Sequence, residues 1–230
     1  MINFIKENLP NVYQLGLFGD QGWLTAIGQT LYMTFWGAIF GGFLGLVTGL
    51  ILVITDTNGI KENKVVNFIL DKIVSVFRAL PFIILLVLVT PLTRSIFHVG
   101  IGVNAALVPL SLSVWPFYAR QVQVALTETG NGKIEAALAS GATFWDLIGL
   151  YLKESRSELI RVSTVSLISL VGLTAMAGAI GAGGIGTTAI VMGYQRYYND
   201  VTLLATAIVL LIVLIIQFSG DKLAKHYNHK

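Results

Sequence analysis

Long apolar segments are the feature that most restricts how this chain folds. About five of them approach the ~20 residues that a helix needs to cross the hydrocarbon core of a bilayer. They are residues 23–54, 73–92, 101–125, 159–180 and 201–218. Only 12% of the 230 residues are charged and the mean hydropathy is +0.76, which is far from the composition of a soluble domain. Because a segment in lipid must satisfy its own backbone hydrogen bonds, we expect an all-α membrane protein.

The stretches outside these segments suggest the domain boundaries. Residues 1–22 carry Lys6 and Glu7 among scattered apolar residues, which predicts an interfacial segment. Residues 23–225 are expected to form one transmembrane domain, and residues 226–230 a cytoplasmic tail. Prolines lie within the second and third apolar segments, so kinked helices are expected there.

Lys and Arg residues are distributed unevenly between the two sides of the predicted bundle. One side receives only Lys6, Arg94 and Arg196, and the other side receives all the rest. Since short cytoplasmic loops carry an excess of Lys and Arg, the second side is expected to be cytoplasmic. The N-terminus is then outside, the C-terminus inside, and the loop of residues 126–158 cytoplasmic. The basic residues are too dispersed to predict a nucleic-acid site.

The loop of residues 126–158 has the period of an amphipathic helix. Apolar or small residues recur at steps of three and four, namely Ile134, Leu138, Gly141, Trp145, Ile148 and Leu152. The loop is too polar to span a bilayer, so a cytoplasmic amphipathic helix between the third and fourth spans is expected. Periodicity alone leaves open a helix that simply lies flat on the inner membrane surface.

The residue order within this loop favours a more specific interpretation. Glu135, Ala136 and Ala137 are followed after three residues by Gly141 and then by a hydrophobic stretch, which resembles the coupling loop of bacterial ABC-importer permeases. The resemblance implies that the loop docks into a cleft of a cytoplasmic ATPase, with the small residues allowing close packing and Glu135 making a charged contact. The family pattern ends in Leu-Pro, where this chain has Lys153 and Glu154. This departure leaves open whether the chain breaks between the coupling helix and the fourth span.

Five further segments are similar to methionine-importer permeases, a resemblance that covers about residues 23–225. They are residues 77–86 (FRALPFIILL), 91–94 (PLTR), 170–176 (LVGLTAM), 178–186 (GAIGAGGIG) and 217–221 (QFSGD). The resemblance implies a homodimer of permeases in the bacterial cytoplasmic membrane, two ATP-binding-cassette ATPase subunits, and an extracytoplasmic methionine-binding lipoprotein or other binding protein. It implies alternating access driven by those ATPases.

Two groups of glycines are candidate structural or pathway residues. Gly37, Gly41, Gly45 and Gly49 recur along one face of the first span, as in close helix packing within or between subunits. The second group lies at the end of the fourth span, where a translocation path or outer gate is expected. Its candidate residues are Met176, Gly178, Gly181, Gly183 and Gly184. The spacing of Gly181, Gly183 and Gly186 matches a dinucleotide fingerprint, but the required strand–helix context is missing.

Several other functions are weighed against a methionine importer permease. An importer of another small amino acid stays open, and so does an ATPase-independent secondary transporter, although neither inverted repeats nor buried ionisable pairs are visible in the sequence. A membrane enzyme is not expected, because the H-E-x-x-H and G-x-S-x-G motifs are missing. Without a phosphate loop or cysteines, and with no metal-ligand spacing among the histidines beyond a tail pair, we expect no ATPase site, cofactor or metal.

Overall fold

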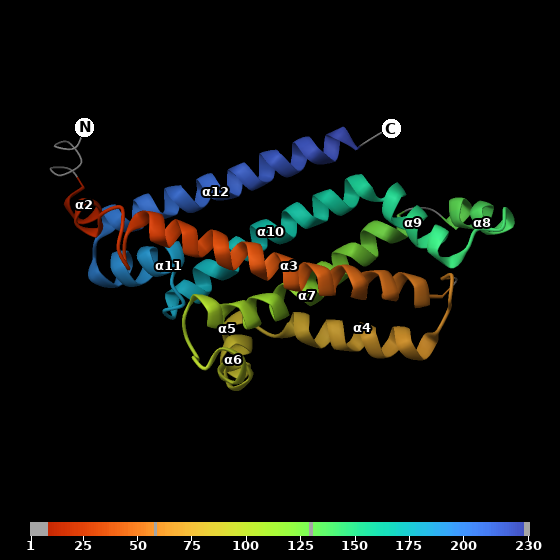
Figure 1. Cartoon of the computed structure of the whole chain (residues 1–230), viewed down its shortest axis with the longest axis horizontal. Helices are drawn as coiled ribbons and strands as arrows, with labels where there is room; N and C mark the ends of the chain where they lie inside the picture. Colours follow the sequence, from red (N-terminus) through yellow and green to blue (C-terminus); the bar gives the residue numbers. More distant parts are fainter. Residues whose placement is uncertain (1–8, 58, 129–130, 228–230) are drawn as a thin grey trace. The chain divides into compact units, whose positions relative to one another are not determined.

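The computed structural model describes residues 9–57, 59–128 and 131–227, and the regular elements among them are helices (Figure 1). In chain order these are α2 (Pro10–Leu15), α3 (Trp23–Thr55), α4 (Lys64–Ala79), α5 (Phe82–Leu88), α6 (Thr90–Phe97), α7 (Val103–Thr127), α8 (Asn131–Ala139), α9 (Phe144–Glu154), α10 (Arg156–Ala179), α11 (Gly184–Thr187), the π-helix η1 (Thr188–Gly193), the 3₁₀ turn η2 (Tyr194–Arg196) and α12 (Asn199–His226). Residues 1–8 and 228–230 lie outside this description, with Lys6, Glu7 and most of the expected tail.

Three helices are long and apolar enough to cross a bilayer by themselves: α3, α10 and α12. They coincide with the first, fourth and fifth predicted segments, and α7 coincides with the third. The all-α fold class is therefore confirmed for the described residues.

The second predicted segment, residues 73–92, is not one kinked helix. Leu80 adopts an extended conformation (φ −75°, ψ 122°), because a residue before proline is hindered from the helical region. The helix α4 consequently ends at Ala79, α5 begins after Pro81, and Pro91 lies in the first turn of α6. In contrast, α7 continues as a single helix through both of its prolines.

Two compact units share the long helices. The first contains Met1–Ile39, Pro81–Ser111 and Leu167–Ile215, and the second contains Phe40–Leu80, Leu112–Ser166 and Ile216–Lys230. Each unit has its own buried side chains and its own candidate functional residues.

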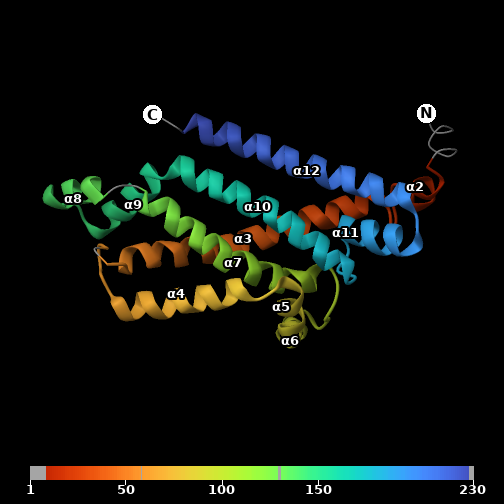
Figure 2. The same cartoon turned by 180° about the vertical axis from the view of Figure 1, so that it is seen from behind.

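The core of the first unit draws on six helices. Its largest fully buried side chains are Met33, Leu85, Leu110, Leu170, Val171, Ile185 and Val201. The short helix α2 lies beside the first turns of α12 in both ribbon views (Figures 1 and 2). Two hydrogen bonds join these helices: the Asn11 backbone N–H donates to Asp200 Oδ2 over 3.1 Å, and Asn11 Nδ2 donates to Asp200 Oδ1 over 3.0 Å. Trp23 Nε1 also donates to the carbonyl of Val12 over 3.1 Å, so the segment before α3 is fastened at two places.

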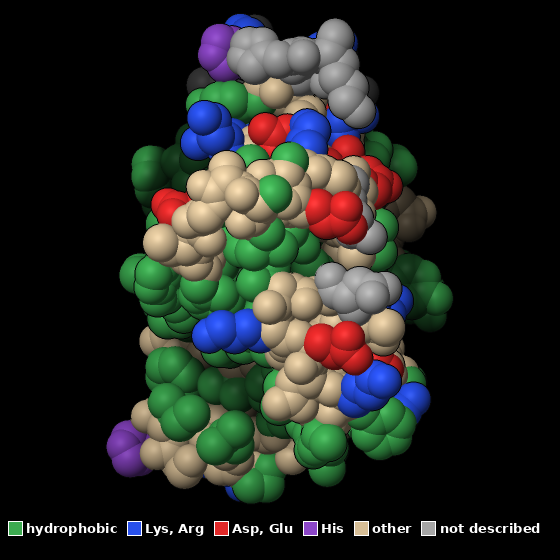
Figure 3. Space-filling model, turned by 90° about the vertical axis from the view of Figure 1, so that its right-hand side faces the viewer, with side chains coloured by type: hydrophobic (Ala, Val, Ile, Leu, Met, Phe, Trp, Pro, Cys, Tyr) green, Lys and Arg blue, Asp and Glu red, His purple; other side chains and the backbone are tan. Residues whose placement is uncertain are grey.

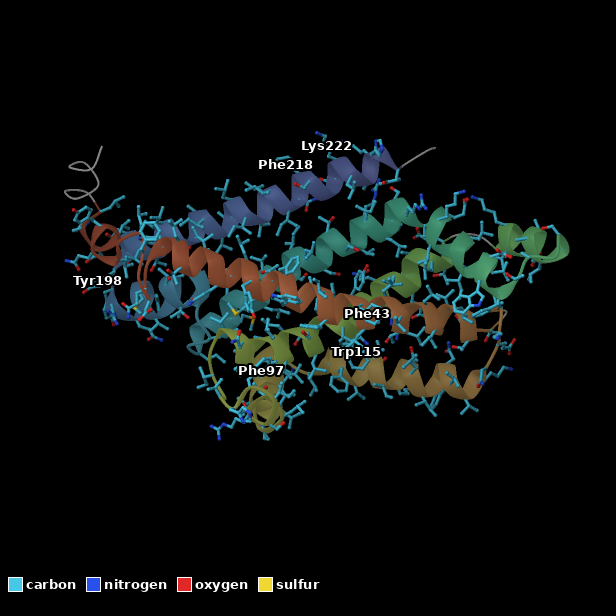
Figure 4. All side chains as sticks on the ribbon, in the orientation of Figure 1. Phe43, Phe97, Trp115, Tyr198, Phe218 and Lys222 are labelled. Carbon is cyan, nitrogen blue, oxygen red and sulfur yellow. The ribbon has the colours of Figure 1, made fainter. Side chains whose placement is uncertain are left out.

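Close contact between α3 and α7 holds the second unit together. A Cβ atom added to Gly45 would lie 2.9 Å from the carbonyl oxygen of Trp115, and one added to Gly49 would lie 2.6 Å from that of Ala119. Trp115, labelled in Figure 4, donates from Nε1 to Thr48 Oγ1 over 2.9 Å.

The predicted row of glycines on α3 lies on a buried face. Gly37, in the first unit, and Gly41, Gly45 and Gly49, in the second, are all buried. A Cβ atom on Gly37 would lie 3.3 Å from the Leu170 side chain, a contact with α10 inside the same chain.

Candidate functional site

The loop after α7 folds into a helical hairpin made of α8 and α9, which belongs to the second unit. Gly141 lies between the two helices with φ +83°, a value that ends a right-handed helix. The Gly141 N–H donates to Leu138 O and the Ala142 N–H to Ala137 O, both over 3.0 Å, which is the Schellman pattern of a helix C-terminus. The predicted amphipathic helix over residues 134–152 is therefore not one continuous helix, because the backbone reverses at Gly141.

Capping side chains define where α9 begins. The Thr143 hydroxyl accepts from the Asp146 backbone N–H, and the Asp146 carboxylate accepts in return from the Thr143 N–H over 2.8 Å. This capping box satisfies donors that a helix N-terminus otherwise leaves open. The hydrogen bonds from Thr143 also hold the pKa of Asp146 below its ordinary value.

At its other end, α9 stops at Glu154 and α10 starts at Arg156, with the buried residue Ser155 between them. A break thus exists before α10 although the family's proline is missing. Glu154, which stands in place of that proline, forms an ion pair with Lys133 of α8. The hydrogen bond and charge of Lys133 lower the pKa of Glu154.

A hydrophobic cluster fixes the hairpin to the rest of the second unit. Its buried members come from α3, α7, α8 and α9 and are Val53, Val122, Leu126, Ile134, Leu147 and Tyr151. Burial also raises the pKa of the Tyr151 hydroxyl. Lys61, from the loop before α4, lies with Nζ 4.4 Å from the centre of the Phe144 ring. The hairpin is thereby attached directly to α3 and α7.

The predicted docking residues lie on and around the tip of α8. Glu135, Ala136 and Gly141 are exposed, and Ala137 is half-buried against the hydrophobic cluster. Gly141 has open space within 4 Å of the position of a Cβ atom, so its positive φ rather than close packing within the chain accounts for the glycine.

The change of direction at Gly141 also disperses the predicted apolar face. Leu138 and Trp145 are 49% and 76% exposed, whereas Ile134 and Leu147 are buried. Figure 3, which looks onto the side of α8 and α9, shows acidic and basic side chains interspersed with exposed hydrophobic ones. The hairpin therefore presents a mixed surface suited to a protein partner.

The second set of predicted residues lies in the first unit. Met176 and Gly178 are in the last turns of α10, and Gly181, Gly183 and Gly184 are in the glycine turn of residues 180–184 that follows. The Gly181 N–H donates to Gly178 O over 3.0 Å and the Ala182 N–H to Ala177 O over 3.1 Å, so α10 also ends in a Schellman motif. Gly181, Gly183 and Gly184 have φ values of +89°, +96° and +75°, which residues with a Cβ atom rarely adopt.

After the turn, the chain packs back against the last turns of α10. A Cβ atom on Gly178 would lie 2.5 Å from the Thr187 backbone nitrogen, and one on Gly186 would lie 2.4 Å from Ala175 O. Thr187 Oγ1 bridges the two arms by donating to Gly178 O and accepting from the Gly183 N–H. Met176, the other predicted pathway residue, is 40% exposed on α10.

Two residues of α3 that the sequence analysis did not single out bind the glycine turn. The Gly184 N–H donates to Gln29 Oε1 over 2.7 Å, and the Ile185 N–H donates to Thr30 Oγ1 over 2.8 Å. A glutamine within an apolar segment is unusual, and that was the signal available in the sequence.

The structure further pairs Asp71 of α4 with Arg120 of α7, a link not foreseen from the sequence.

Comparison with known families identifies the chain. A family model described as "binding-protein-dependent transport system inner membrane component" matches residues 41–229. The chain belongs to this family. As an inner-membrane component, it lies in the bacterial cytoplasmic membrane. Among the residues that the structure describes, no three His, Asp or Glu side chains gather as a metal site.

Named relatives cover most of this inner-membrane component. It is 42% identical over 203 residues to the probable D-methionine transport system permease protein MetI of Pasteurella multocida, across 88% of this chain and 94% of the relative. It is 43% identical over 194 residues to the methionine import system permease protein MetP of Bacillus subtilis, across 84% and 87% of the two chains.

Solved structures share its fold. A chain from inward-facing conformations of the MetNI methionine ABC transporter superimposes with a TM-score of 0.88 at 38% identity, covering 90% of this chain and 96% of that one. A chain from an amino acid ABC transporter crystallised with histidines gives a TM-score of 0.74 at 16% identity, across 98% of each chain, which shows a shared fold alone.

Proposed function

We propose that this inner-membrane component is the permease subunit of an ABC importer that moves methionine into the cell. Its similarity to methionine-transport permeases extends over most of its length and includes a MetNI structure. The observation that carries the mechanism is the α8–α9 hairpin, whose exposed residues Glu135, Ala136 and Gly141 stand on a base packed against α3 and α7.

In this proposal the hairpin is the contact through which ATPase subunits drive the permease. Two ATPase copies would bind the hairpins of a permease homodimer, with Glu135 offering a charge and Ala136 a small contact surface. Because Leu147 and Ile134 are buried in one cluster with Val53 and Val122, displacement of the hairpin would pull on α3 and α7 together. Closely packed side chains transmit a displacement because a packed core leaves little free volume to absorb it.

The proposed topology has five spans, with the N-terminus outside and the C-terminus inside. The spans are α3, the broken segment α4–α5, α7, α10 and α12. Residues 1–22 would be an interfacial segment, residues 23–225 the transmembrane domain and residues 226–230 a cytoplasmic tail. This arrangement puts the α8–α9 hairpin in the cytoplasm and the glycine turn at the outer side.

The glycine turn is the proposed outer gate. Met176 and Gly178 would lie along the translocation path, and Gly181, Gly183 and Gly184 would shape the turn that closes it. Gly37, Gly41, Gly45 and Gly49 would hold α3 against the rest of its own subunit. ATP hydrolysis is assigned to the partner ATPases, methionine delivery to an extracytoplasmic binding protein, and no cofactor to this chain.

Co-purification with a methionine-importer ATPase subunit tests the docking contact. The double variant Glu135→Arg/Gly141→Arg is expected to lose the complex, whereas Glu128→Arg, which changes an exposed carboxylate just beyond α7, is expected to keep it. Retention of the ATPase by the double variant would refute the assignment of the hairpin.

Uptake into proteoliposomes tests the function. The permease with its ATPase and binding protein should import labelled methionine only with ATP. Import by the permease alone would identify a secondary transporter instead, and stronger competition by an unrelated amino acid would identify a different substrate.

A further inference from the structure

The first turn of α11 is bound by side chains from a distant part of the chain. The Gly184 and Ile185 N–H groups open this helix and have no carbonyl partner of their own within it. They donate to Gln29 Oε1 and Thr30 Oγ1, residues that lie 155 positions earlier in the sequence. Both contacts lie inside the first unit.

Thr30 is a fixed acceptor. Its hydroxyl donates to Ala26 O over 3.0 Å, and the residue is only 2% exposed. The hydroxyl therefore has a defined orientation, with an acceptor lone pair left for the N–H of Ile185, which is itself fully buried. If the two residues separated, a buried donor would be left without a partner.

The glycines of the turn make this contact possible. A Cβ atom on Gly183 would lie 2.7 Å from Gln29 Oε1, and one on Gly184 would lie 2.6 Å from Thr30 Oγ1. A side chain at either position would push α3 away. The absence of side chains there thus serves contact with α3 as well as the reversal of the chain.

We propose that Gln29 and Thr30 are positioning residues of the outer gate, which tie the glycine turn to α3 so that the two move as one body between transport states. The inference rests on the assignment of the glycine turn as the gate. It differs from a hinge at the glycines, in which the turn would move while α3 stayed in place.

Spin-label distances in the assembled transporter separate these mechanisms. The chain contains no cysteine of its own, so labels attach only where one is introduced. Leu24 on α3 and Ile180 at the turn are exposed sites for labels. Distances are measured without nucleotide and with a non-hydrolysable ATP analogue, and labelled subunits are diluted with unlabelled ones for the 24–180 pair.

The inference predicts that the distance between the two copies of residue 180 changes with nucleotide while the 24–180 distance within one subunit stays constant. A change in both distances would overturn the inference and leave the gate assignment standing. A constant distance between the two copies of residue 180 would overturn the gate assignment and the inference together, with the importer function unaffected.

Substitutions at the two acceptors give an independent readout. Thr30→Val removes the acceptor at constant shape, and Thr30→Ser keeps it. The methionine moved per ATP hydrolysed is expected to fall about tenfold in Thr30→Val, which corresponds to the loss of one buried hydrogen bond, and to recover in Thr30→Ser.

Gln29→Met and Gln29→Glu form a second pair, in which only the glutamate keeps an acceptor oxygen. This pair preserves the test if Thr30→Val does not assemble. A lower yield of assembled transporter with unchanged methionine moved per ATP would show that the residues are merely structural and would overturn the inference.

Discussion

Replacement of Gly141 by alanine isolates the contribution of backbone conformation to the α8–α9 hairpin. Gly141 has φ +83°, and a Cβ atom there would meet nothing within 4 Å. Steric overlap with neighbouring residues therefore contributes nothing, and the penalty is that of a left-handed L-residue, about 1–2 kcal/mol. The population of hairpins opened at the turn should rise roughly 5- to 30-fold.

The matched control is Gly149→Ala, an exposed glycine inside α9 that also has open space around it. Its φ is not positive, so alanine should stabilise the helix by about 0.5–1 kcal/mol. Hydrogen exchange measured by mass spectrometry would report both changes in the α8–α9 amides of the membrane-reconstituted permease. Gly141→Asn should be intermediate, because asparagine tolerates the left-handed region.

Opposite signs for the two alanine variants are the key result. Equal effects at Gly141 and Gly149 would show that the turn is not held by the left-handed residue, and the conformational explanation of Gly141 would fail. An effect of Gly141→Ala on ATPase binding with unchanged amide exchange would instead indicate that the partner itself approaches this position.

Three further changes test other contacts. Lys133 lowers the pKa of Glu154, so the stabilisation from their ion pair is complete above the ordinary carboxylate pKa of about 4 and is lost as the pH falls through the lowered value. The distance between spin labels on α8 and α9 should therefore lengthen at that low pH, and it should not respond to pH in Glu154→Gln. Leu147→Ala, at a side chain only 1% exposed, should cost about 2–5 kcal/mol, and unchanged amide exchange in α9 would contradict the packing. Gly49→Ala should lower the melting temperature, because overpacking costs about 1–3 kcal/mol of stability, whereas Gly42→Ala, with open space around it, should not. Equal melting temperatures of the two variants would disprove the close approach of α3 and α7.

Much of the candidate site was accessible from the sequence because it depends on local residue order. The motif from Glu135 to Gly141 was placed in a loop, and the ends of α3 and α10 and the start of α12 follow the apolar segments within a few residues. What sequence periodicity could not supply was the phase of the helices around Gly141. The apolar spacing continues through that residue, so Leu138 and Trp145 were expected on a common face that the left-handed backbone disperses.

The broken second segment likewise could not be predicted from the local sequence. Pro81 predicts a disturbance, but a proline in a span is compatible with a kink as well as with a break. The extended backbone of Leu80 decides for a break, while both prolines of α7 remain inside one continuous helix. Tertiary surroundings, rather than the proline alone, determine which outcome occurs.

By itself, the sequence determined the membrane environment, the helical class, the approximate positions of α3, α7, α10 and α12, and the family, because these depend on composition, segment length and short motifs. Only the tertiary structure decided that Glu154 pairs with Lys133 where the family has proline, and that Gln29 and Thr30 hold the glycine turn. The physical reason is distance along the chain. Partners 155 residues apart leave no periodic signal, and they meet only because folded helices bring their polar groups together in an environment where unpaired donors are costly.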